Sequence, residues 1–205
     1  MARARVRPDE AQPTGDVDRS AWLVGRRIYW LLVYGPPLDG SAQSLIGLNK
    51  MQTWPDARTV GVIGDTHGLI RESVIQALAR VDLILHAGDV GRSEVLGQLR
   101  KLAPVVAIAG NIDSHIPSLP PTEIVSVRNR LIYLIHSLAD LDLNPTVAGI
   151  SMVVSGHSHR PSVHEKDGVL YVNPGSIGPR RFKLPITFVL AEFFCTTIYE
   201  VYYGR

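Results

Sequence analysis

Three short apolar runs dominate the middle of the sequence, and each is followed by glycine and a polar residue. They span 59–63, 82–87 and 105–109. The runs are rich in β-branched residues and too short for helices, so they predict buried strands. Amphipathic segments at 72–79 and 93–102 separate them and predict helices. Strands and helices that alternate in short units favour a parallel sheet.

Paired strands predominate in the second half of the chain. Segments 123–127 and 131–135 flank a polar turn, and a second hairpin is expected around 166–168. A short helix is expected near 138–148, and the remaining predicted strands are 152–154, 169–172, 186–193 and 196–203. The two halves together predict an α/β fold in which two sheets form an α-β-β-α sandwich, with helices outside and the loops gathered at one rim.

Residues 1–57 differ from the rest in composition. They mix proline, glycine, serine and charged residues, and no hydrophobic period lasts long enough to fix an element. We therefore divide the chain into an N-terminal extension at 1–57, mostly disordered, and one domain at 58–205. The aromatic patch at 28–34 could instead add an edge strand or dock on the domain. The natural product could also begin at Met51.

Composition bears on compartment and partners. The formal net charge of +2 is too small to argue for a nucleic-acid surface, so nucleic acid is the weaker candidate partner. The single cysteine, Cys195, cannot form an internal disulfide, and we expect it to be buried. No run approaches the roughly 18 apolar residues that cross a bilayer. We therefore expect a cytoplasmic protein without a membrane partner.

Seven potential metal donors follow the ends of predicted strands. They are Asp65, His67, Asp89, Asn111, His136, His157 and His159. Open α/β sheets place their chemistry at the carboxyl ends of their strands, so these side chains should meet at one edge. Carboxylate, imidazole and amide donors suit manganese first, with Fe, Zn, Ni, Co or Mg as alternatives, rather than calcium. Seven donors suit two divalent ions that share a carboxylate, and such a pair can clamp a phosphoryl group and activate a bridging water.

The donors lie in segments that resemble, in order and spacing, the five motifs of the calcineurin-like metallophosphoesterases. The motifs are Gly64-Asp65-Thr66-His67-Gly68, Gly88-Asp89, Gly110-Asn111-Ile112-Asp113, His136 and Gly156-His157-Ser158-His159. A further segment, Asn173-Pro174-Gly175-Ser176, resembles the small single-domain bacterial and archaeal phosphodiesterase branch, to which the retromer scaffolding subunit is related. The resemblance covers about residues 58–203.

This resemblance implies that the donors divide between two ions. Asp89 would be the shared ligand. The first ion would be held by Asp65, His67 and His159. The second would be held by Asn111, His136 and His157.

The resemblance also implies a function, the hydrolysis of a small phosphate ester through a metal-bridging hydroxide. Catalytic roles fall to Asp89, Asn111 and His157. Many members have a histidine directly after the asparagine that protonates the leaving alkoxide, but Ile112 stands here and has no proton to give. His115 or a metal-bound water would have to replace it. We therefore expect a phosphodiesterase that favours good leaving groups.

Other roles stay open at this stage. The same fold could serve as a protein-binding scaffold of the retromer type with vestigial activity, and a nuclease and a homo-oligomer are further possibilities. Asp113 is expected to orient a loop rather than bind metal. Arg180 and Arg181 are surface charges or a grip for a substrate phosphate. His86 is expected to be a strand residue with a satisfied hydrogen bond, and His164 to lie at the surface.

Overall fold

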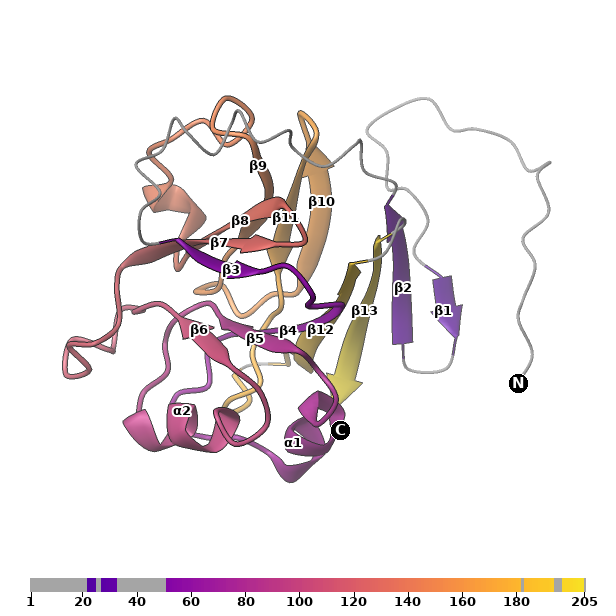
Figure 1. The fold of residues 1–205 in the computed structure, drawn as a ribbon. Helices are drawn as coiled ribbons and strands as arrows, with labels where there is room; N and C mark the ends of the chain where they lie inside the picture. The colour runs from indigo at the N-terminus through magenta and orange to yellow at the C-terminus, as the bar shows by residue number, and fades with distance from the viewer. Residues whose placement is uncertain (1–21, 25–26, 33–50, 182, 194–196, 205) are drawn as a thin grey trace.

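Two mixed β-sheets face each other in the computed structural model, in agreement with the predicted sandwich (Figure 1). The strand order is β1-β2-β13-β12-β4-β5-β6 in the seven-stranded sheet and β10-β11-β9-β8-β7-β3 in the six-stranded sheet. Side chains are described for residues 51–181 and 183–193, and backbone alone for 22–24, 27–32 and 197–204. The expectations for most of the N-terminal extension and for Cys195 lie outside the described residues.

The seven-stranded sheet holds the three apolar runs in its parallel half. Strands β4, β5 and β6 pair in parallel, as predicted, and β12 pairs antiparallel with β4 on the other side. The strands are β1 (Trp22–Val24), β2 (Arg27–Leu32), β4 (Thr59–Ile63), β5 (Leu83–His86), β6 (Val105–Ala107), β12 (Ile186–Phe193) and β13 (Thr197–Gly204).

The two predicted helices, α1 (Glu72–Leu78) and α2 (Ser93–Leu99), cover the outer face of this sheet (Figure 1). Helix α1 buries Val74 and Leu78 against β-branched and leucine side chains of the sheet, and α2 adds its own apolar stripe. Their amphipathic spacing explains why they lie there, since only one face of each is apolar. Neither seven-residue helix, nor any other in the described part of the chain, has the length and apolar character to span a membrane.

The six-stranded sheet is built around two tight hairpins. Its strands are β3 (Gln52–Trp54), β7 (Thr122–Val127), β8 (Arg130–Ile135), β9 (Ile150–Val154), β10 (Ser162–Lys166) and β11 (Val169–Asn173). Both residues of each turn, Arg128-Asn129 and Asp167-Gly168, have positive φ. This backbone matches the twist of two-residue hairpins. The predicted positions of both hairpins are thus confirmed.

The predicted helix at 138–148 is wrong. Only a 3₁₀ turn at Leu138–Asp140 forms, and the chain then continues through turns that cover the outer face of the six-stranded sheet. Pro145 explains the difference, because proline disfavours a helical conformation at the preceding residue. Asn144 instead accepts hydrogen bonds through its side chain from the backbone N–H groups of Thr146 and Val147. Leu141, Leu143 and Ala148 therefore pack against the sheet without a helix, whereas Leu138 and Val147 are exposed.

The first strands of the chain join both sheets. Strand β2 covers most of the aromatic patch and pairs antiparallel with β13, with β1 at the edge beyond it. Strand β3 pairs in parallel with β7 in the other sheet. The division of the chain at residues 57 and 58 stays a prediction, but strands on its N-terminal side pair with strands of the domain.

Candidate metal centre

The loop after β4 and the loop after β5 are held side by side by backbone hydrogen bonds. The N–H of Asp65 donates to the Gly88 carbonyl at 3.0 Å, and the N–H of His67 donates to the Asp89 carbonyl at 2.9 Å. Because the two parallel strands are adjacent, their carboxyl ends deliver both loops to the same edge. The carboxylates of Asp65 and Asp89 are therefore fixed close to each other before any ligand is bound.

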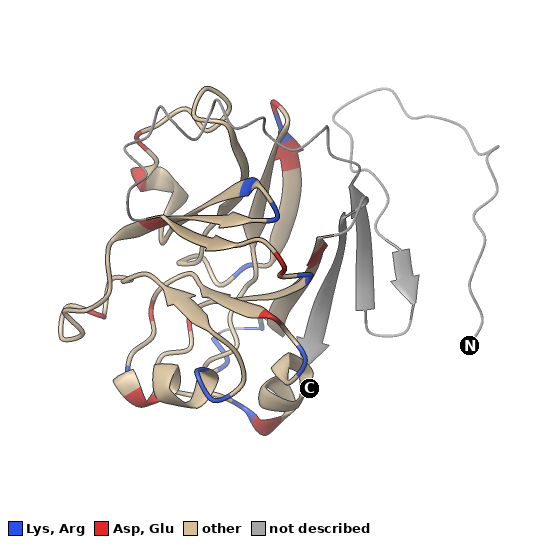
Figure 2. Ribbon diagram, in the orientation of Figure 1, with Lys and Arg blue, Asp and Glu red and all other residues tan. Residues whose placement is uncertain are grey.

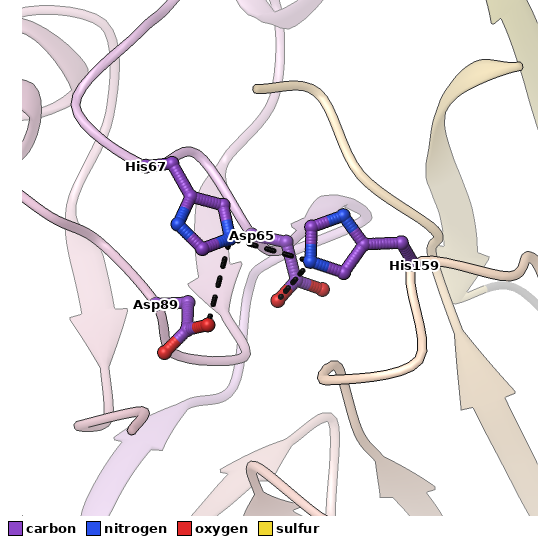
Figure 3. Close-up of side chains that lie close together, drawn as sticks. All are labelled: Asp65, His67, Asp89 and His159. Atoms are coloured by element: carbon purple, nitrogen blue, oxygen red, sulfur yellow. Dashed lines mark hydrogen bonds and ion pairs between the residues drawn. The ribbon is translucent and has the colours of Figure 1, made fainter. Parts of the chain in front are cut away.

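Four of the predicted ligands form one tight cluster. The candidate ligand atoms of Asp65, His67, Asp89 and His159 all lie within 4.8 Å of one another. His67 lies between Asp89 and His159, with its Nε2 atom 3.5 Å from Asp89 Oδ2 and 3.2 Å from His159 Nε2 (Figure 3). His159 Nε2 is in turn 3.5 Å from Asp65 Oδ1.

The other three predicted ligands lie on the opposite side of Asp89. His136 Nε2 is 3.5 Å from Asp89 Oδ1, and the His136 ring meets the His157 ring edge to face at 5.3 Å. His157 Nδ1 is 3.0 Å from Asn111 Oδ1. The structure thus brings all seven donors to one rim of the sandwich, and the two oxygens of Asp89 face different imidazoles.

A backbone carbonyl sets the tautomer of His136. Its Nδ1 atom lies 2.7 Å from the Ala87 carbonyl oxygen. Because a carbonyl only accepts, Nδ1 must carry the proton, which leaves the lone pair of the neutral ring on Nε2. That lone pair points toward Asp89, as a metal ligand requires.

Asp113 holds in place the loop that carries Asp89 and the loop that carries Asn111, which confirms its predicted orienting role. Its buried carboxylate accepts from the backbone N–H groups of Val90, Gly91 and Gly110 at 2.8–2.9 Å. Burial favours the neutral acid, but these three donors outweigh it and lower the pKa of Asp113. Asp113 therefore stays ionised while it fixes the positions of Asp89 and Asn111.

The Asn173 to Ser176 turn supports the site in a way that the sequence did not reveal. Ser176 donates through its hydroxyl to the backbone carbonyl of Asp65 at 2.8 Å, and Asn173 donates through Nδ2 to the Gly156 carbonyl at 2.7 Å. The motif was recognised as a family signature, but its role depends on contacts far apart in the sequence. It ties the loop after β11 to the loops that carry Asp65 and His157.

Left-handed backbone conformations are concentrated at the donors. Asp65, His67, Asp89, His157 and His159 all have φ between +46° and +67°. Such conformations cost about 1–3 kcal/mol outside glycine and collect at functional sites. At Gly110 the constraint is space, because a Cβ there would lie 2.2 Å from the backbone nitrogen of Asp89.

The protonation properties of the site fit a metal ion. Burial, reinforced by the charge of Asp89, raises the pKa of Asp65 to about 8. Burial, together with the nearby charges of Arg181 and His67, lowers the pKa of His159 to about 4. Six buried side-chain atoms in the described residues lack a hydrogen-bond partner, and two of them, Asp65 Oδ2 and His136 Nε2, belong to this set of donors. Divalent cations would satisfy such a donor set.

The remaining histidines and Arg181 differ in their contacts. His86 is completely buried, and its Nε2 bonds to the Thr66 hydroxyl at 2.9 Å. Its Nδ1 has no partner among the described residues, so the predicted hydrogen bond accounts for only one nitrogen. His164 is exposed, as predicted, and stacks on Tyr171. His115 Nε2 lies 3.2 Å from the Gly91 carbonyl, and Arg181 lies 3.4 Å from His67 Nδ1.

Comparison with known proteins identifies the family. Residues 59–194 match the profile of the calcineurin-like phosphoesterase superfamily domain, which is well over half of the chain. The chain belongs to the calcineurin-like phosphoesterase superfamily. This membership implies a phosphoester substrate, and the Asp65, His67, Asp89 and His159 cluster is the candidate metal site of this calcineurin-like phosphoesterase.

Individual relatives agree with the family. A "Probable metallophosphoesterase" of Methanothermobacter thermautotrophicus is 33% identical over 144 residues, which cover 64% of this chain and 84% of that protein. Another, from Methanocaldococcus jannaschii, is 36% identical over 130 residues, 57% of this chain and 67% of that protein. The solved structure of Vps29 from Entamoeba histolytica complexed with Zn²⁺ matches with a TM-score of 0.60 and 26% identity, over 69% of this chain and 91% of that one.

Proposed function

We propose that this calcineurin-like phosphoesterase binds two divalent cations, manganese first, and hydrolyses phosphodiesters. The observation that carries the proposal is the position of Asp89 between two groups of donors. Its Oδ2 faces His67 and its Oδ1 faces His136, each at 3.5 Å. A carboxylate with one oxygen directed to each side is suited to join two metal ions.

The ligand sets follow from this division. Asp65, His67 and His159 would hold one cation, Asn111, His136 and His157 the other, and Asp89 both. Two cations at such a site supply Lewis-acid stabilisation of a phosphoryl group and activation of water. Asn111 and His157 are exposed, whereas Asp65 and Asp89 are buried, so a substrate can contact the asparagine and the histidine directly. This supports the proposed catalytic roles of Asn111 and His157 beside Asp89.

Arg181 extends the site toward an anionic substrate. Its guanidinium lies against the ring of His67, and its side chain is exposed to solvent. Guanidinium groups bind phosphate oxygens through paired hydrogen bonds. This contact supports a role for Arg181 in orienting a substrate phosphate beside His67, rather than as a surface charge alone.

The lack of a positioned general acid at residues 112 and 115 favours diesters with good leaving groups. The side chain of Ile112 is 41% exposed and cannot donate a proton. His115, the nearest alternative in sequence, bonds through Nε2 to the Gly91 carbonyl. Without a positioned general acid, an alkoxide leaves poorly, and the loss is about 10²-fold or more. Aryl or otherwise acidic alcohols depart without that help.

The proposal is tested by turnover and metal content together. With Mn²⁺, the protein should hydrolyse bis-(p-nitrophenyl) phosphate much faster than simple sugar phosphates. Asp89→Asn should lose most of this activity and part of the bound metal, whereas Asp167→Asn, in the exposed β10–β11 turn, should retain both. Faster turnover of sugar phosphates would overturn the diester preference. If neither the parent protein nor Asp89→Asn hydrolyses any ester but both still bind a protein partner, the scaffold function would be favoured instead.

A further inference from the structure

A cavity opens directly beside the Asn111 and His136 side of the metal centre. Its volume is about 490 Å³, and its wall includes Asn111, His136, Tyr133, Ile135, Asp140 and Asp142. This volume lies in the range of small-molecule pockets, which is about 300–1,000 Å³. Because two proposed metal ligands form part of the wall, a molecule bound at the centre can extend into the cavity.

The charge of this cavity is negative. Asp140 and Asp142 are exposed, and among the described residues neither carboxylate has a hydrogen bond or an ion pair. The sequence contains no lysine or arginine between residues 131 and 159. In Figure 2 the segment between β8 and β9 accordingly carries acidic but no basic positions.

Tyr133 provides an independent sign of a ligand. The residue is only 5% exposed and lines the cavity, yet its hydroxyl has no hydrogen bond within the described chain. The hydroxyl is not among the fully enclosed atoms that lack a partner, so it is accessible and free to bond a ligand in the cavity. The face of a tyrosine ring also attracts cations, most strongly where water is excluded. Tyr133 therefore offers its hydroxyl, and the part of its ring that lines the cavity, to a bound group.

We propose that this cavity binds one of the two alcohol groups of a phosphodiester substrate, and that this group carries an organic cation such as an ammonium. The inference rests on the proposed diesterase function and specifies its substrate class. Two carboxylates without partners and a buried tyrosine favour a positive group over a neutral one. A negatively charged group would be repelled by the same carboxylates.

The two sides of the centre are then complementary to such a zwitterionic diester. Arg181 lies beside His67 on one side, and Asp140 and Asp142 line the cavity on the other. The phosphate would lie between them, with its cationic alcohol toward the two aspartates. A nucleic-acid strand would bring a second phosphate toward the aspartates, so this arrangement also disfavours a nuclease.

Three chromogenic diesters that differ only in one alcohol test the proposal. They are the 2-aminoethyl, ethyl and 2-carboxyethyl esters of p-nitrophenyl phosphate, assayed with the full chain and Mn²⁺. We expect the aminoethyl ester to have a KM about tenfold lower than the ethyl ester, from two weak ion pairs. The carboxyethyl ester should have the highest KM. High salt should reduce the differences.

Matched variants locate the effect. Asp140→Asn combined with Asp142→Asn should remove the KM difference between the three esters, while Asp167→Asn should keep it. A 2-trimethylammonioethyl ester separates the attraction of the two carboxylates from that of the Tyr133 ring. A lower KM for this ester than for the aminoethyl ester would assign the larger part of the attraction to the ring. Equal KM values for the aminoethyl and ethyl esters, or a preference that the double variant retains, would overturn the proposal.

A binding measurement separates this inference from the proposed function. If none of the esters is hydrolysed, the diesterase proposal fails. Calorimetric titration with 2-aminoethyl methyl phosphate and with dimethyl phosphate still tests the cavity. Tighter binding of the amine, lost in the double variant, would support a cation site, and equal binding would refute it.

Discussion

His67 and His159 face each other through their Nε2 atoms at 3.2 Å, although 92 positions separate them in the sequence. Their rings are stacked at a centroid distance of 5.1 Å. Burial is the main cause that lowers the pKa of both imidazoles. Two neutral rings can satisfy this contact only when one of them donates, whereas a cation between them would use both lone pairs. The pair is therefore prepared for a metal at neutral pH.

Metal binding should release a proton from Asp65. Its pKa is raised to about 8 in the metal-free centre, so the carboxyl is mostly protonated at pH 7 and must ionise to coordinate a cation. His67 and His159, with lowered pKa values, are already neutral there. Apparent Mn²⁺ affinity should fall by up to about tenfold for each pH unit below 8. Calorimetry in buffers of different ionisation enthalpy measures the proton, and a titration at pH 6.5 without proton release would contradict the prediction.

The same raised pKa makes the stability of the metal-free protein depend on pH. A carboxyl whose folded-state pKa lies above its ordinary value of 3.8 contributes stability at low pH that is lost as the pH rises through about 8. As the pH rises from 3.8 to about 8, Asp65 should progressively lower the free energy of unfolding of the metal-free protein, and added Mn²⁺ should restore it. Urea unfolding at pH 5 and pH 8, with and without the ion, measures the effect. An Mn²⁺ stabilisation that does not grow with pH would argue against it.

Replacement of Asp113 by alanine should destabilise the fold. Three backbone N–H groups would lose a charged acceptor, and the expected cost is about 3 kcal/mol in the free energy of unfolding. The loops of Asp89 and Asn111 would also lose their anchor, so metal affinity should fall. Chemical denaturation of the metal-free protein measures the first effect. A loss below about 1 kcal/mol would mean that water replaces the carboxylate.

Two glycine substitutions form a matched pair. In Gly110→Ala the new Cβ would lie 2.3 Å from Asp89 Oδ1, so we expect a loss of about 1–3 kcal/mol and of metal binding. In Gly97→Ala, within α2, the Cβ meets nothing within 4 Å, and stability should rise by about 0.5–1 kcal/mol. Thermal unfolding and metal analysis of both variants provide the comparison. Equal behaviour of the two would show that Gly110 does not position Asp89.

Ile112→His should extend the substrate range. The side chain at this position is 41% exposed, so the change should cost little stability, while its backbone N–H donates to Asp89 Oδ1 at 3.2 Å. An imidazole there could protonate an alkoxide, and turnover of alkyl phosphate esters should rise by up to about 10²-fold. Aryl diesters should gain much less. Ile112→Gln, polar but without an acid, is the control, and an equal gain in both variants would rule out acid catalysis.

The donors could be predicted from the sequence because each stands next to a short apolar strand, and parallel strands end at one edge. The resemblance implied that Asp89 lies between the ligand groups of His67 and His136, but which carboxylate oxygen faces which imidazole depends on side-chain rotamers and could not be predicted. The cavity beside the centre could not either. It requires the register that sets Thr122 of β7 opposite Ile135 of β8, and a sequence pattern does not fix that register.

The segment after β8 shows a second limit. Its leucines and alanine suggested a helix, but Pro145 and the side-chain hydrogen bonds of Asn144 favour turns. The outer face of the six-stranded sheet is buried all the same. The predicted helix is therefore wrong because local turn chemistry prevailed.

The left-handed backbone of Asp65, His67, Asp89, His157 and His159 restricts how this protein can change during evolution. Aspartate, asparagine, histidine and glycine are the residues that adopt such φ values most readily. The polypeptide could lose its cations and keep its shape only through a narrow set of replacements, chiefly asparagine or glycine. Any bulkier or β-branched newcomer at these five positions would disturb architecture and chemistry together.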